Sequence, residues 1–269
     1  MTVSGRLQNR IAVVTGGARG LGRSHALALA REGARVAVVD ICRTPQESTY
    51  GMGRKSDLER TARDVESIGG QALPLVCNVA DQDDVREMVR TVVEKWGHID
   101  ILVNNAGVIS ISSVVELKES QWDLVMDVNL KGTFLCCKYA LLHMLRRKEG
   151  RIINTGSLAG RDAIPLNAHY GAAKAGVHLF TQALAKEVAS YGINVNAVAP
   201  GGVNTAMMER AIAPALAVVW NIPEAEAYRA FCERFNVSSR EVREQDVSNV
   251  VVWLALEETR NLTGVIVYV

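Results

Sequence analysis

Short runs of branched apolar residues alternate along the chain with longer segments of helical periodicity, and this alternation constrains the fold most. The apolar runs expected to form buried strands are residues 11–14, 35–39, 72–77, 101–103, 151–154, 193–198 and 265–269. The expected helices lie near residues 21–32, 57–68, 82–96, 119–147, 168–190 and 242–257. This order predicts an α/β fold, a single doubly wound parallel sheet of about seven strands with helices on both faces and right-handed crossovers.

Two connections are longer than a compact α/β unit needs. One is an insertion near residues 41–56 and the other a segment near residues 202–239, and no linker divides the expected single domain of residues 1–269. Because MMERAIAPALAVVWNIPEAEAYRAF is apolar and amphipathic, we interpret the second segment as a substrate lid. The residues that either line its apolar pocket or, equally, cover the core or a subunit contact are Met207, Met208, Val218, Val219 and Trp220.

Charge and cysteine content narrow the class of protein. The formal net charge is +1 with no long run of one sign, which favours neither nucleic acid nor an anionic membrane as partner. Five cysteines without a CxxC pair fit neither a disulfide framework nor a zinc site. No apolar run reaches the roughly 20 residues of a transmembrane helix, and MTVSGRLQNR lacks the apolar core of a secretory signal. We therefore expect a soluble, cytoplasmic protein with reduced thiols and no metal.

A glycine-rich turn, TGGARGLG, joins the first expected strand to the first expected helix. Such a turn directs backbone N–H groups and the positive helix end to one point, which suits a pyrophosphate. The spacing of Gly16, Gly20 and Gly22 differs from the GxGxxG of the commonest dinucleotide fingerprint. On this motif alone, a tight turn without a ligand is the alternative.

Asp40 ends the second expected strand, where a carboxylate can accept hydrogen bonds from both adenosine ribose hydroxyls and repel a 2′-phosphate. This favours NAD over NADP. Arg19 inside the glycine turn and Arg43 near by point the other way, since a basic residue there often accompanies a 2′-phosphate. We weigh Asp40 more heavily because a phosphate against it would place two like charges in contact. A plain surface aspartate is the remaining alternative.

Candidate catalytic side chains follow later in the chain. Tyr170 and Lys174 are four residues apart in HYGAAKAG, so on a helix they share one face. Ser157 follows the fifth expected strand, at the sheet edge where ligands of such folds bind. The NNAG motif of residues 104–107 suits close approach to a cofactor. These motifs follow the glycine turn and Asp40 in the order expected for one binding site, so their joint occurrence by chance is improbable.

Over its whole length the chain resembles the short-chain dehydrogenase/reductase family, whose fold is of the Rossmann type. The TGxxxGxG pattern, NNAG, the upstream serine and the Tyr–Lys pair carry the resemblance. Asn129, in DVNLKGTF, matches the family's fourth catalytic position beside Ser157, Tyr170 and Lys174. The cofactor-binding residues that the motifs and the resemblance imply are Gly16, Arg19, Gly20, Leu21, Gly22, Asp40, Ile41, Asn78, Val79, Asn105, Ala106, Gly107, Tyr170, Lys174, Pro200, Gly201, Val203 and Thr205.

The resemblance implies hydride transfer between a nicotinamide and an alcohol or ketone, with Tyr170 as general acid and base. Asp40 favours NAD as the cofactor, and the apolar lid favours a hydrophobic or cyclic secondary alcohol or ketone over a sugar or a highly charged thioester. A free tyrosine has a pKa of about 10, so Lys174 and the nicotinamide charge are expected to lower it. Lys174 would also hold the nicotinamide ribose, and Ser157 the substrate oxygen. Asn129 would support a water that leads protons from Lys174 to solvent.

ARGLGRSHA, VVDICR and the insertion before SDLERTARDVESIGG are similar to the mycofactocin-coupled, carveol-dehydrogenase-like branch of this family. In that branch the insertion lies near the cofactor, which is held tightly and recycled in place by another redox carrier. A simple surface excursion is the alternative for this insertion. The resemblance also implies a homotetramer built on the helices near residues 82–96 and 119–147. Family members usually continue past the last strand into a glycine-containing tail, whereas this sequence ends at Val269.

Two other functions stay open at this point. An NADPH-dependent 3-oxoacyl thioester reductase would be supported by Arg19. A non-catalytic dinucleotide-binding regulator is less favoured, because such proteins typically lose the Tyr or the Lys that this chain retains as Tyr170 and Lys174.

Overall fold

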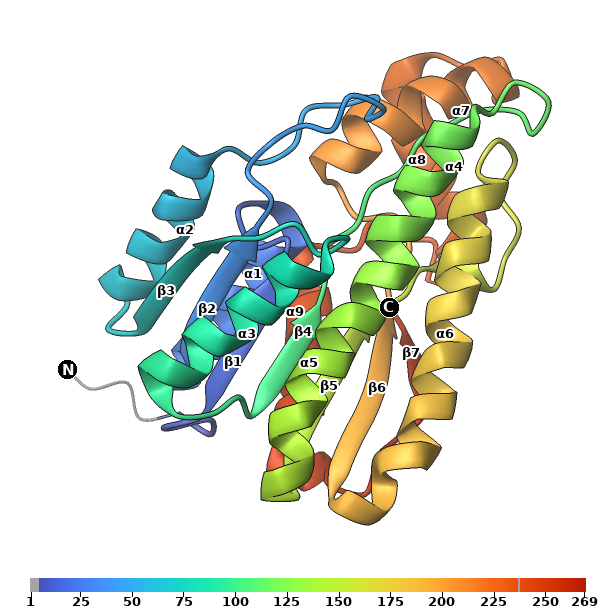
Figure 1. The fold of residues 1–269 in the computed structure, drawn as a ribbon. Coiled ribbons are helices and arrows are strands. Elements are labelled where there is room, and N and C mark those ends of the chain that lie inside the picture. Colours follow the sequence, from blue (N-terminus) through green and yellow to red (C-terminus); the bar gives the residue numbers. More distant parts are fainter. Residues whose placement is uncertain (1–4, 237) are drawn as a thin grey trace.

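The computed structural model describes residues 5–236 and 238–269, which contain one parallel sheet in the order β3-β2-β1-β4-β5-β6-β7 (Figure 1). Its strands are β1 (Ile11–Thr15), β2 (Arg35–Asp40), β3 (Gln71–Val76), β4 (Ile101–Asn104), β5 (Gly150–Thr155), β6 (Ile193–Ala199) and β7 (Ile266–Tyr268). The prediction of a single doubly wound α/β sheet is therefore confirmed.

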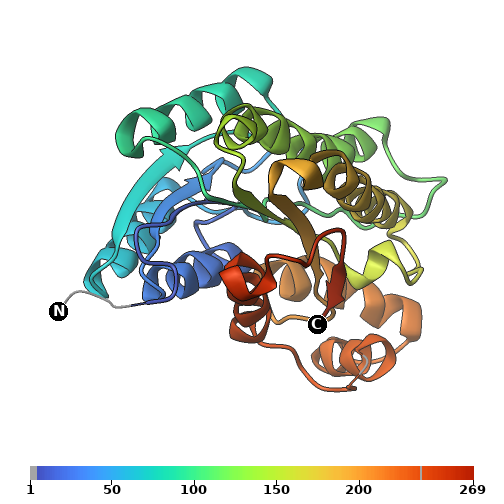
Figure 2. The ribbon, with the colours of Figure 1, turned by 90° about the horizontal axis from the view of Figure 1, so that it is seen from below.

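Helices cover both faces of this sheet (Figure 2). One face carries α3 (Gln82–Trp96), α5 (Gly132–Arg147) and α6 (Ala168–Val188). The other carries α1 (Gly20–Arg31), α2 (Lys55–Ser67) and α9 (Glu244–Ala255). In α3, for example, the buried residues recur every three or four positions, which places one apolar stripe against the sheet: Val85, Met88, Val89 and Val92. The short 3-10 turns are η2 (Leu158–Gly160), η3 (Ala189–Tyr191) and η5 (Glu257–Thr259).

The expectation that all seven strands are buried is wrong for β3 and β7. Each lies at an edge of the sheet and pairs with a neighbour on one side only. Strand β3 contains only exposed and half-buried residues, and Val76 at its end is 59% exposed. Strand β7 is half-buried throughout. Apolar sequence alone does not distinguish an edge strand from a central one.

The segment expected as one helix over residues 119–147 is a continuous helix with a π-helical turn inside it. It comprises α4 (Glu119–Met126), the π-helical turn η1 (Asp127–Lys131) and α5. A π-helical turn widens the backbone spiral locally and occurs frequently at functional sites. Here it contains Asn129, which the sequence places among the candidate catalytic residues.

The insertion and the expected lid lie at the same end of the sheet (Figure 1). Residues 41–54 form neither helix nor strand, and α2 begins at Lys55. The segment after β6 forms the π-helical turn η4 (Met208–Ile212), α7 (Ala213–Trp220) and α8 (Glu224–Phe235).

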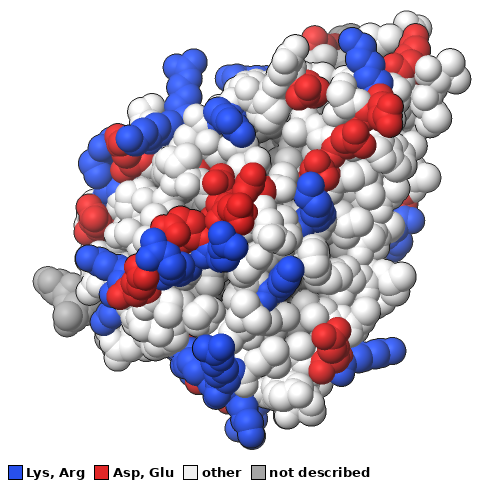
Figure 3. Space-filling view, in the orientation of Figure 1, with Lys and Arg blue, Asp and Glu red and all other residues white. Residues whose placement is uncertain are grey.

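Charged side chains of both signs are interspersed over the face seen in Figure 3. Among the helices of the described residues, none is long and apolar enough to cross a membrane.

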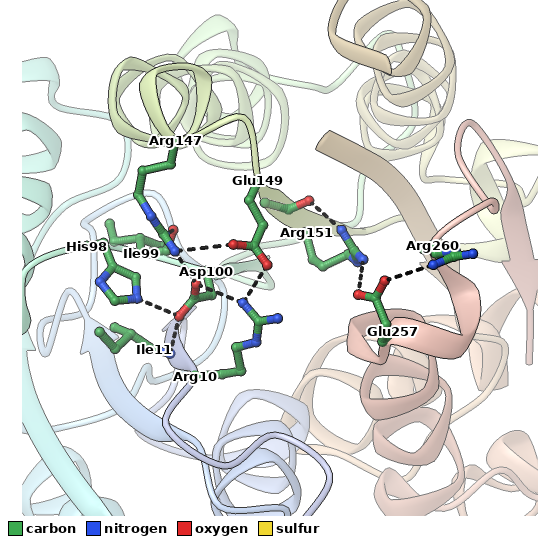
Figure 4. Close-up of polar contacts among 11 residues, drawn as sticks. Arg10, Ile11, His98, Ile99, Asp100, Arg147, Glu149, Arg151, Glu257 and Arg260 are labelled. Atoms are coloured by element: carbon green, nitrogen blue, oxygen red, sulfur yellow. Dashed lines mark hydrogen bonds and ion pairs between the residues drawn. The ribbon is translucent and has the colours of Figure 1, made fainter. Parts of the chain in front are cut away.

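The opposite, amino-terminal end of the sheet holds a network of ion pairs around Asp100 (Figure 4). The Asp100 carboxylate is 3% exposed and lies 3.3 Å from an Arg10 nitrogen, 3.0 Å from an Arg147 nitrogen and 3.0 Å from Nε2 of His98. It also accepts a hydrogen bond from the backbone N–H of Ile11 at 2.8 Å. These contacts tie the start of β1 to the loop before β4 and to the end of α5.

Candidate active site

A cavity of about 430 Å³ lies at the carboxyl end of the strands, where the sheet order switches between β1 and β4. Open α/β sheets bind ligands in such a crevice. The cavity is lined by all the predicted cofactor-binding residues: Gly16, Arg19, Gly20, Leu21, Gly22, Asp40, Ile41, Asn78, Val79, Asn105, Ala106, Gly107, Tyr170, Lys174, Pro200, Gly201, Val203 and Thr205. Ser157 also lines it, whereas Asn129 is completely buried beside it.

The glycine turn needs glycine at two positions for steric reasons. Gly16 has φ +65°, and a Cβ there would lie 2.9 Å from the Cα of Ala106. A Cβ on Gly22 would lie 2.1 Å from the carbonyl oxygen of Gly16. Helix α1 begins at Gly20 on the cavity wall. The backbone N–H groups of its first turn would therefore stabilise a negatively charged ligand in the cavity.

The NNAG segment is fastened to this turn through Thr15. The Thr15 hydroxyl oxygen accepts hydrogen bonds from the backbone N–H groups of Asn105 and Ala106, both at 3.0 Å. The Asn105 side-chain amide donates to the Thr15 carbonyl at 2.9 Å. These bonds hold two loops of the cavity wall in one fixed arrangement.

Asp40 is held in place at the end of β2. Its two carboxylate oxygens accept hydrogen bonds from the backbone N–H groups of Ala18 at 3.1 Å and Cys42 at 3.0 Å. The side chain is 8% exposed, and Gly53 of the insertion lies against it. Asn78, at the start of the loop after β3, uses Oδ1 to accept from the backbone of Ala80 at 3.2 Å.

Arg19 is engaged by the insertion. Its guanidinium donates to the carbonyl of Gly51 at 2.5 Å and lies 5.9 Å from the ring centroid of Tyr50. Tyr50 is 6% exposed and belongs to the same apolar core as Ile109 and Ala211. The insertion therefore crosses the cavity wall towards the segment after β6. Sequence reasoning missed Tyr50, Met52 and Gly53 as cavity residues, although a buried aromatic in a long loop was an available signal.

The lid candidates separate into two groups. Met207 and Met208 line the cavity, joined by apolar side chains that the sequence did not single out: Ile164, Ile212 and Phe231. Val218 is 82% exposed and Val219 is 42% exposed, so both lie on the outer side of α7. Trp220 stacks on Phe235 instead of lining the cavity. Pocket lining is therefore wrong for Val218, Val219 and Trp220, because the cavity meets the start of this segment and not the end of α7.

The four candidate catalytic side chains converge. The Ser157 hydroxyl lies close enough to Tyr170 to lower the pKa of that side chain. The Lys174 ammonium donates to the Thr155 carbonyl at 2.8 Å and lies 5.6 Å from the Tyr170 ring centroid. A Cβ on Gly107 would lie 2.8 Å from Oδ1 of Asn129 and 3.7 Å from Nζ of Lys174, so glycine there leaves room between them.

Asn129 is fixed by its amide nitrogen, which donates to the carbonyls of Val108 and Val125, both at 2.8 Å. Its Oδ1 is buried and has no protein partner among the described residues. The π-helical turn thus holds one free acceptor beside Lys174.

Comparison with known proteins agrees with this arrangement. Residues 10–215 match the family model described as short chain dehydrogenase. The chain belongs to the short-chain dehydrogenase family. It is 35% identical over 262 residues to the 3-oxoacyl-[acyl-carrier-protein] reductase FabG of Thermotoga maritima, covering 97% of this chain and 96% of the relative. The FabG reductase of Staphylococcus aureus strain N315 is 38% identical over 258 residues, covering 96% and 95%.

Two solved structures share the fold over nearly their whole length. Carveol dehydrogenase from Mycobacterium avium in complex with NAD superposes with a TM-score of 0.90 at 32% identity, covering 98% of this chain and 97% of that one. Levodione reductase superposes with a TM-score of 0.86 at 29% identity, covering 97% and 96%. The chain is accordingly an oxidoreductase of the short-chain dehydrogenase family.

Burial dominates the proton affinities in this short-chain dehydrogenase. It raises the pKa of Tyr170 to about 12, against the opposing effect of the Ser157 hydrogen bond. It lowers the pKa of Lys174 to about 8, because the ammonium is removed from water. The expected lowering of the Tyr170 pKa by Lys174 together with the nicotinamide charge concerns the cofactor complex and stays a prediction.

Proposed function

We propose that this chain is an NAD-dependent dehydrogenase of hydrophobic or cyclic secondary alcohols that also reduces the corresponding ketones. The observation that carries the cofactor choice is the Asp40 carboxylate, aligned by two backbone N–H groups on the cavity wall. Arg19, the nearby candidate for a 2′-phosphate, is occupied by Gly51 and Tyr50. Both features support NAD.

The residues present fit a dinucleotide. Backbone N–H groups of the glycine turn and α1 suit the pyrophosphate, and Asp40 suits the adenosine ribose hydroxyls. Lys174 lies where it can hold the nicotinamide ribose. When bound, the nicotinamide ring supplies the hydride acceptor for alcohol oxidation and the hydride donor for ketone reduction.

The chain's own groups handle the proton. The Tyr170 hydroxyl gives its proton to the carbonyl oxygen in ketone reduction, and the phenolate takes the hydroxyl proton in alcohol oxidation. Ser157, whose hydroxyl lies near Tyr170, orients the substrate oxygen. The free Oδ1 of Asn129 holds a water that links Lys174 to solvent. The apolar side chains of Met207, Met208 and Ile212 favour a hydrophobic substrate.

The insertion supports slow cofactor exchange. Gly53 packs against Asp40, and Tyr50 is buried between the cavity and the apolar core. A dinucleotide beneath this loop leaves only after Tyr50 and its neighbours move. This agrees with the similarity to the carveol-dehydrogenase-like branch and the recycling of its cofactor in place.

A homotetramer is the assembly that we propose with this function. Trp122 and Phe134 are each 42% exposed, and Leu142 is 51% exposed, on the continuous helix of α4, η1 and α5. Burial of this apolar surface between subunits would stabilise the assembly. We place the protein in the cytoplasm because its cysteines within the described residues are free thiols.

The second candidate function is an NADPH-dependent 3-oxoacyl thioester reductase. It is favoured by the names of the relatives from Thermotoga maritima and Staphylococcus aureus. Incubation of the purified protein with either oxidised or reduced NAD or NADP, cyclic alcohols, cyclic ketones and acetoacetyl thioesters, monitored by nicotinamide absorbance, separates the candidates. We expect turnover of cyclic alcohols with NAD. Turnover of thioesters with NADPH alone would contradict this proposal, and NAD binding without any turnover would favour a regulator.

A further inference from the structure

Asn167 is the residue immediately before α6, at the position that usually caps a helix. Its carbonyl accepts the backbone N–H of Gly171 at 2.9 Å, which is the first bond of the helix. Asparagine is among the preferred capping residues because its side chain accepts a hydrogen bond from the first turn. Here the side chain makes no capping hydrogen bond. The Asn167 side chain therefore does not cap the helix.

The Asn167 side chain is buried and faces the cavity. It is 4% exposed, and its Oδ1 has no protein partner within the described part of the chain. Buried polar groups are nearly always hydrogen-bonded, so an unpartnered one needs a ligand, a water or another explanation. Asn167 lines the same cavity as Tyr170, which follows it by three residues.

The backbone before Asn167 is held in an unfavourable conformation. Leu166 has φ +63°, in the left-handed region that a bulky side chain rarely adopts. The Leu166 carbonyl accepts a hydrogen bond from the N–H of Ser112 at 2.9 Å, which ties this segment to the loop after β4. Strain of this kind persists where surrounding structure enforces it, often at ligand sites. This segment leads directly into Asn167.

The cavity that Asn167 lines also has apolar side chains in its wall. They include Ile164, Met207, Met208, Ile212 and Phe231. Apolar walls bind a ligand without fixing its orientation, whereas a single amide among them can fix it through a hydrogen bond.

We infer that Asn167 recognises a second polar group of the substrate, a hydroxyl that donates to Oδ1, on an otherwise apolar ring. The inference rests on the proposed function and narrows it: the substrate is a hydroxylated cyclic ketone, or the corresponding diol. The reacting oxygen meets Ser157 and Tyr170, while the second hydroxyl meets Asn167. Asn167 then determines specificity and does not take part in the proton transfer.

Substrate selectivity provides the first test. The wild type and Asn167→Leu are compared on cyclohexanone and on the ring isomers of hydroxycyclohexanone, with NADH as the reductant. In the wild type, we expect the kcat/KM of at least one hydroxylated isomer to exceed that of cyclohexanone by about tenfold or more. In Asn167→Leu this ratio falls to about one, and the kcat/KM for cyclohexanone stays within about twofold of wild type. An unchanged ratio, or a parallel loss on every ketone, would overturn the inference.

Thermal stability of the free protein provides a second test that needs no substrate. Leucine resembles asparagine in shape, and replacing an unpartnered buried amide by it removes a desolvation penalty. We expect Asn167→Leu to raise Tm by about 2–4 °C. The matched control is Asn196→Leu, because Asn196 is 1% exposed, donates to the Leu262 carbonyl at 2.9 Å and accepts from the Val265 N–H at 3.1 Å. That control should lower Tm.

The two tests separate failure of the inference from failure of the proposed function. If the wild type reduces none of the ketones with NADH or NADPH, the proposed function is wrong and the substrate class falls with it. If Asn167→Leu lowers Tm as Asn196→Leu does, Asn167 is a structural residue, whatever the enzyme reduces. A raised Tm together with a lost preference for the hydroxylated ketone supports the assignment.

Discussion

The two ends of the sheet treat buried charge in opposite ways. At the amino-terminal end, Asp100 is 3% exposed and is surrounded by Arg10, His98, Arg147 and a backbone N–H (Figure 4). At the carboxyl end, Lys174 is also 3% exposed, yet no ion pair within the described residues includes it. The only hydrogen bond of its ammonium among these residues goes to the neutral carbonyl of Thr155. A paired buried charge holds a fold together, whereas an uncompensated one is tolerated where function requires it.

Unpartnered polar atoms show the same difference. Oδ1 of Asn129, Oγ1 of Thr155 and Oδ1 of Asn167 are buried at the carboxyl end without a protein partner among the described residues. At the amino-terminal end, Nε of Arg151 also lacks one, but the same guanidinium contacts Glu257 at 3.1 Å. The carboxyl end therefore keeps free the hydrogen-bonding capacity that the other end has largely used.

The largest expected effect comes from breaking the carboxyl end at Tyr170. Tyr170→Phe removes the proton donor and keeps the ring, so we expect kcat to fall by about 10³-fold. The hydroxyl contacts Ser157 and bears no charge in the fold, so Tm should stay within a few degrees of wild type. Steady-state kinetics and thermal unfolding measure the two quantities. Retention of more than a tenth of the activity would assign the proton transfer to another group.

The next largest effect is expected when the uncompensated charge of Lys174 is removed, and it concerns the pH dependence of stability. The folded pKa of Lys174 is about 8 and its ordinary value is 10.5, so between these values the unfolded chain binds more protons. Wild-type stability should therefore gain up to about 3 kcal/mol from this group as the pH rises from 8 towards 10.5. Above pH 10 the raised pKa of Tyr170 acts in the opposite direction, because the unfolded tyrosine then loses its proton first.

Lys174→Met should abolish this gain while it lowers kcat by about 10²-fold, because the ammonium that holds the nicotinamide ribose beside Tyr170 is lost. Urea unfolding of both proteins at a series of pH values between 7 and about 10 measures the difference. The same pH dependence in both proteins would show that Lys174 is protonated normally in the folded chain.

Asp100→Asn breaks the amino-terminal end. The variant leaves two arginines without their buried carboxylate, and it should lower the free energy of unfolding by about 2–3 kcal/mol. The value stays below that of a fully buried pair because Arg10 and Arg147 are 37% and 32% exposed. Urea unfolding checks the stability, and kcat per folded molecule should not change. Glu149→Gln, at a 40% exposed side chain, is the control and should cost under about 1 kcal/mol.

The sequence predicted the candidate site at the carboxyl end of the sheet better than the ion-pair network at the amino-terminal end. Strand and helix positions agree with the structure within a few residues, because the alternation of apolar runs and helical spacing reflects burial directly. Tyr170 and Lys174 were placed on one helix face by their spacing alone. The Asp100 network was not predicted, because its members come from distant segments and no local spacing connects them.

Other features depended on tertiary contacts that no local pattern encodes. The left-handed backbone of Leu166, next to the buried Asn167, is accompanied by a hydrogen bond from Ser112, which is distant in the sequence. Val218 is exposed because α7 buries its other side, Ala213, Leu216 and Ala217, in a cluster with Phe231 of α8. The sequence marked the insertion as long, but the contact of Tyr50 with the core was beyond local reasoning.

The smallest expected effect concerns the arginines at the two ends of the sheet. Arg10 and Arg147 hold a carboxylate, whereas Arg19 holds a loop carbonyl and lies near the ring of Tyr50. If this contact fastens the insertion over the cofactor, Arg19→Met should release NADH about tenfold faster, since one charged hydrogen bond and a cation–π contact are lost. Displacement of bound NADH by excess NAD, followed by fluorescence, measures the rate.

Two further variants distinguish retention of the cofactor by contacts of the insertion from retention by positive charge alone. Tyr50→Leu leaves the charge unchanged and removes the ring beside Arg19, so it should also accelerate release. Arg43→Met removes a positive charge from the exposed rim near Arg19 and should leave the rate within about twofold, because solvent screens an exposed charge. Equal acceleration by Arg43→Met and Arg19→Met would mean that positive charge alone retains the dinucleotide. Acceleration by Arg19→Met and Tyr50→Leu alone would mean that the insertion retains it by contact, as paired side chains hold the other end of the sheet.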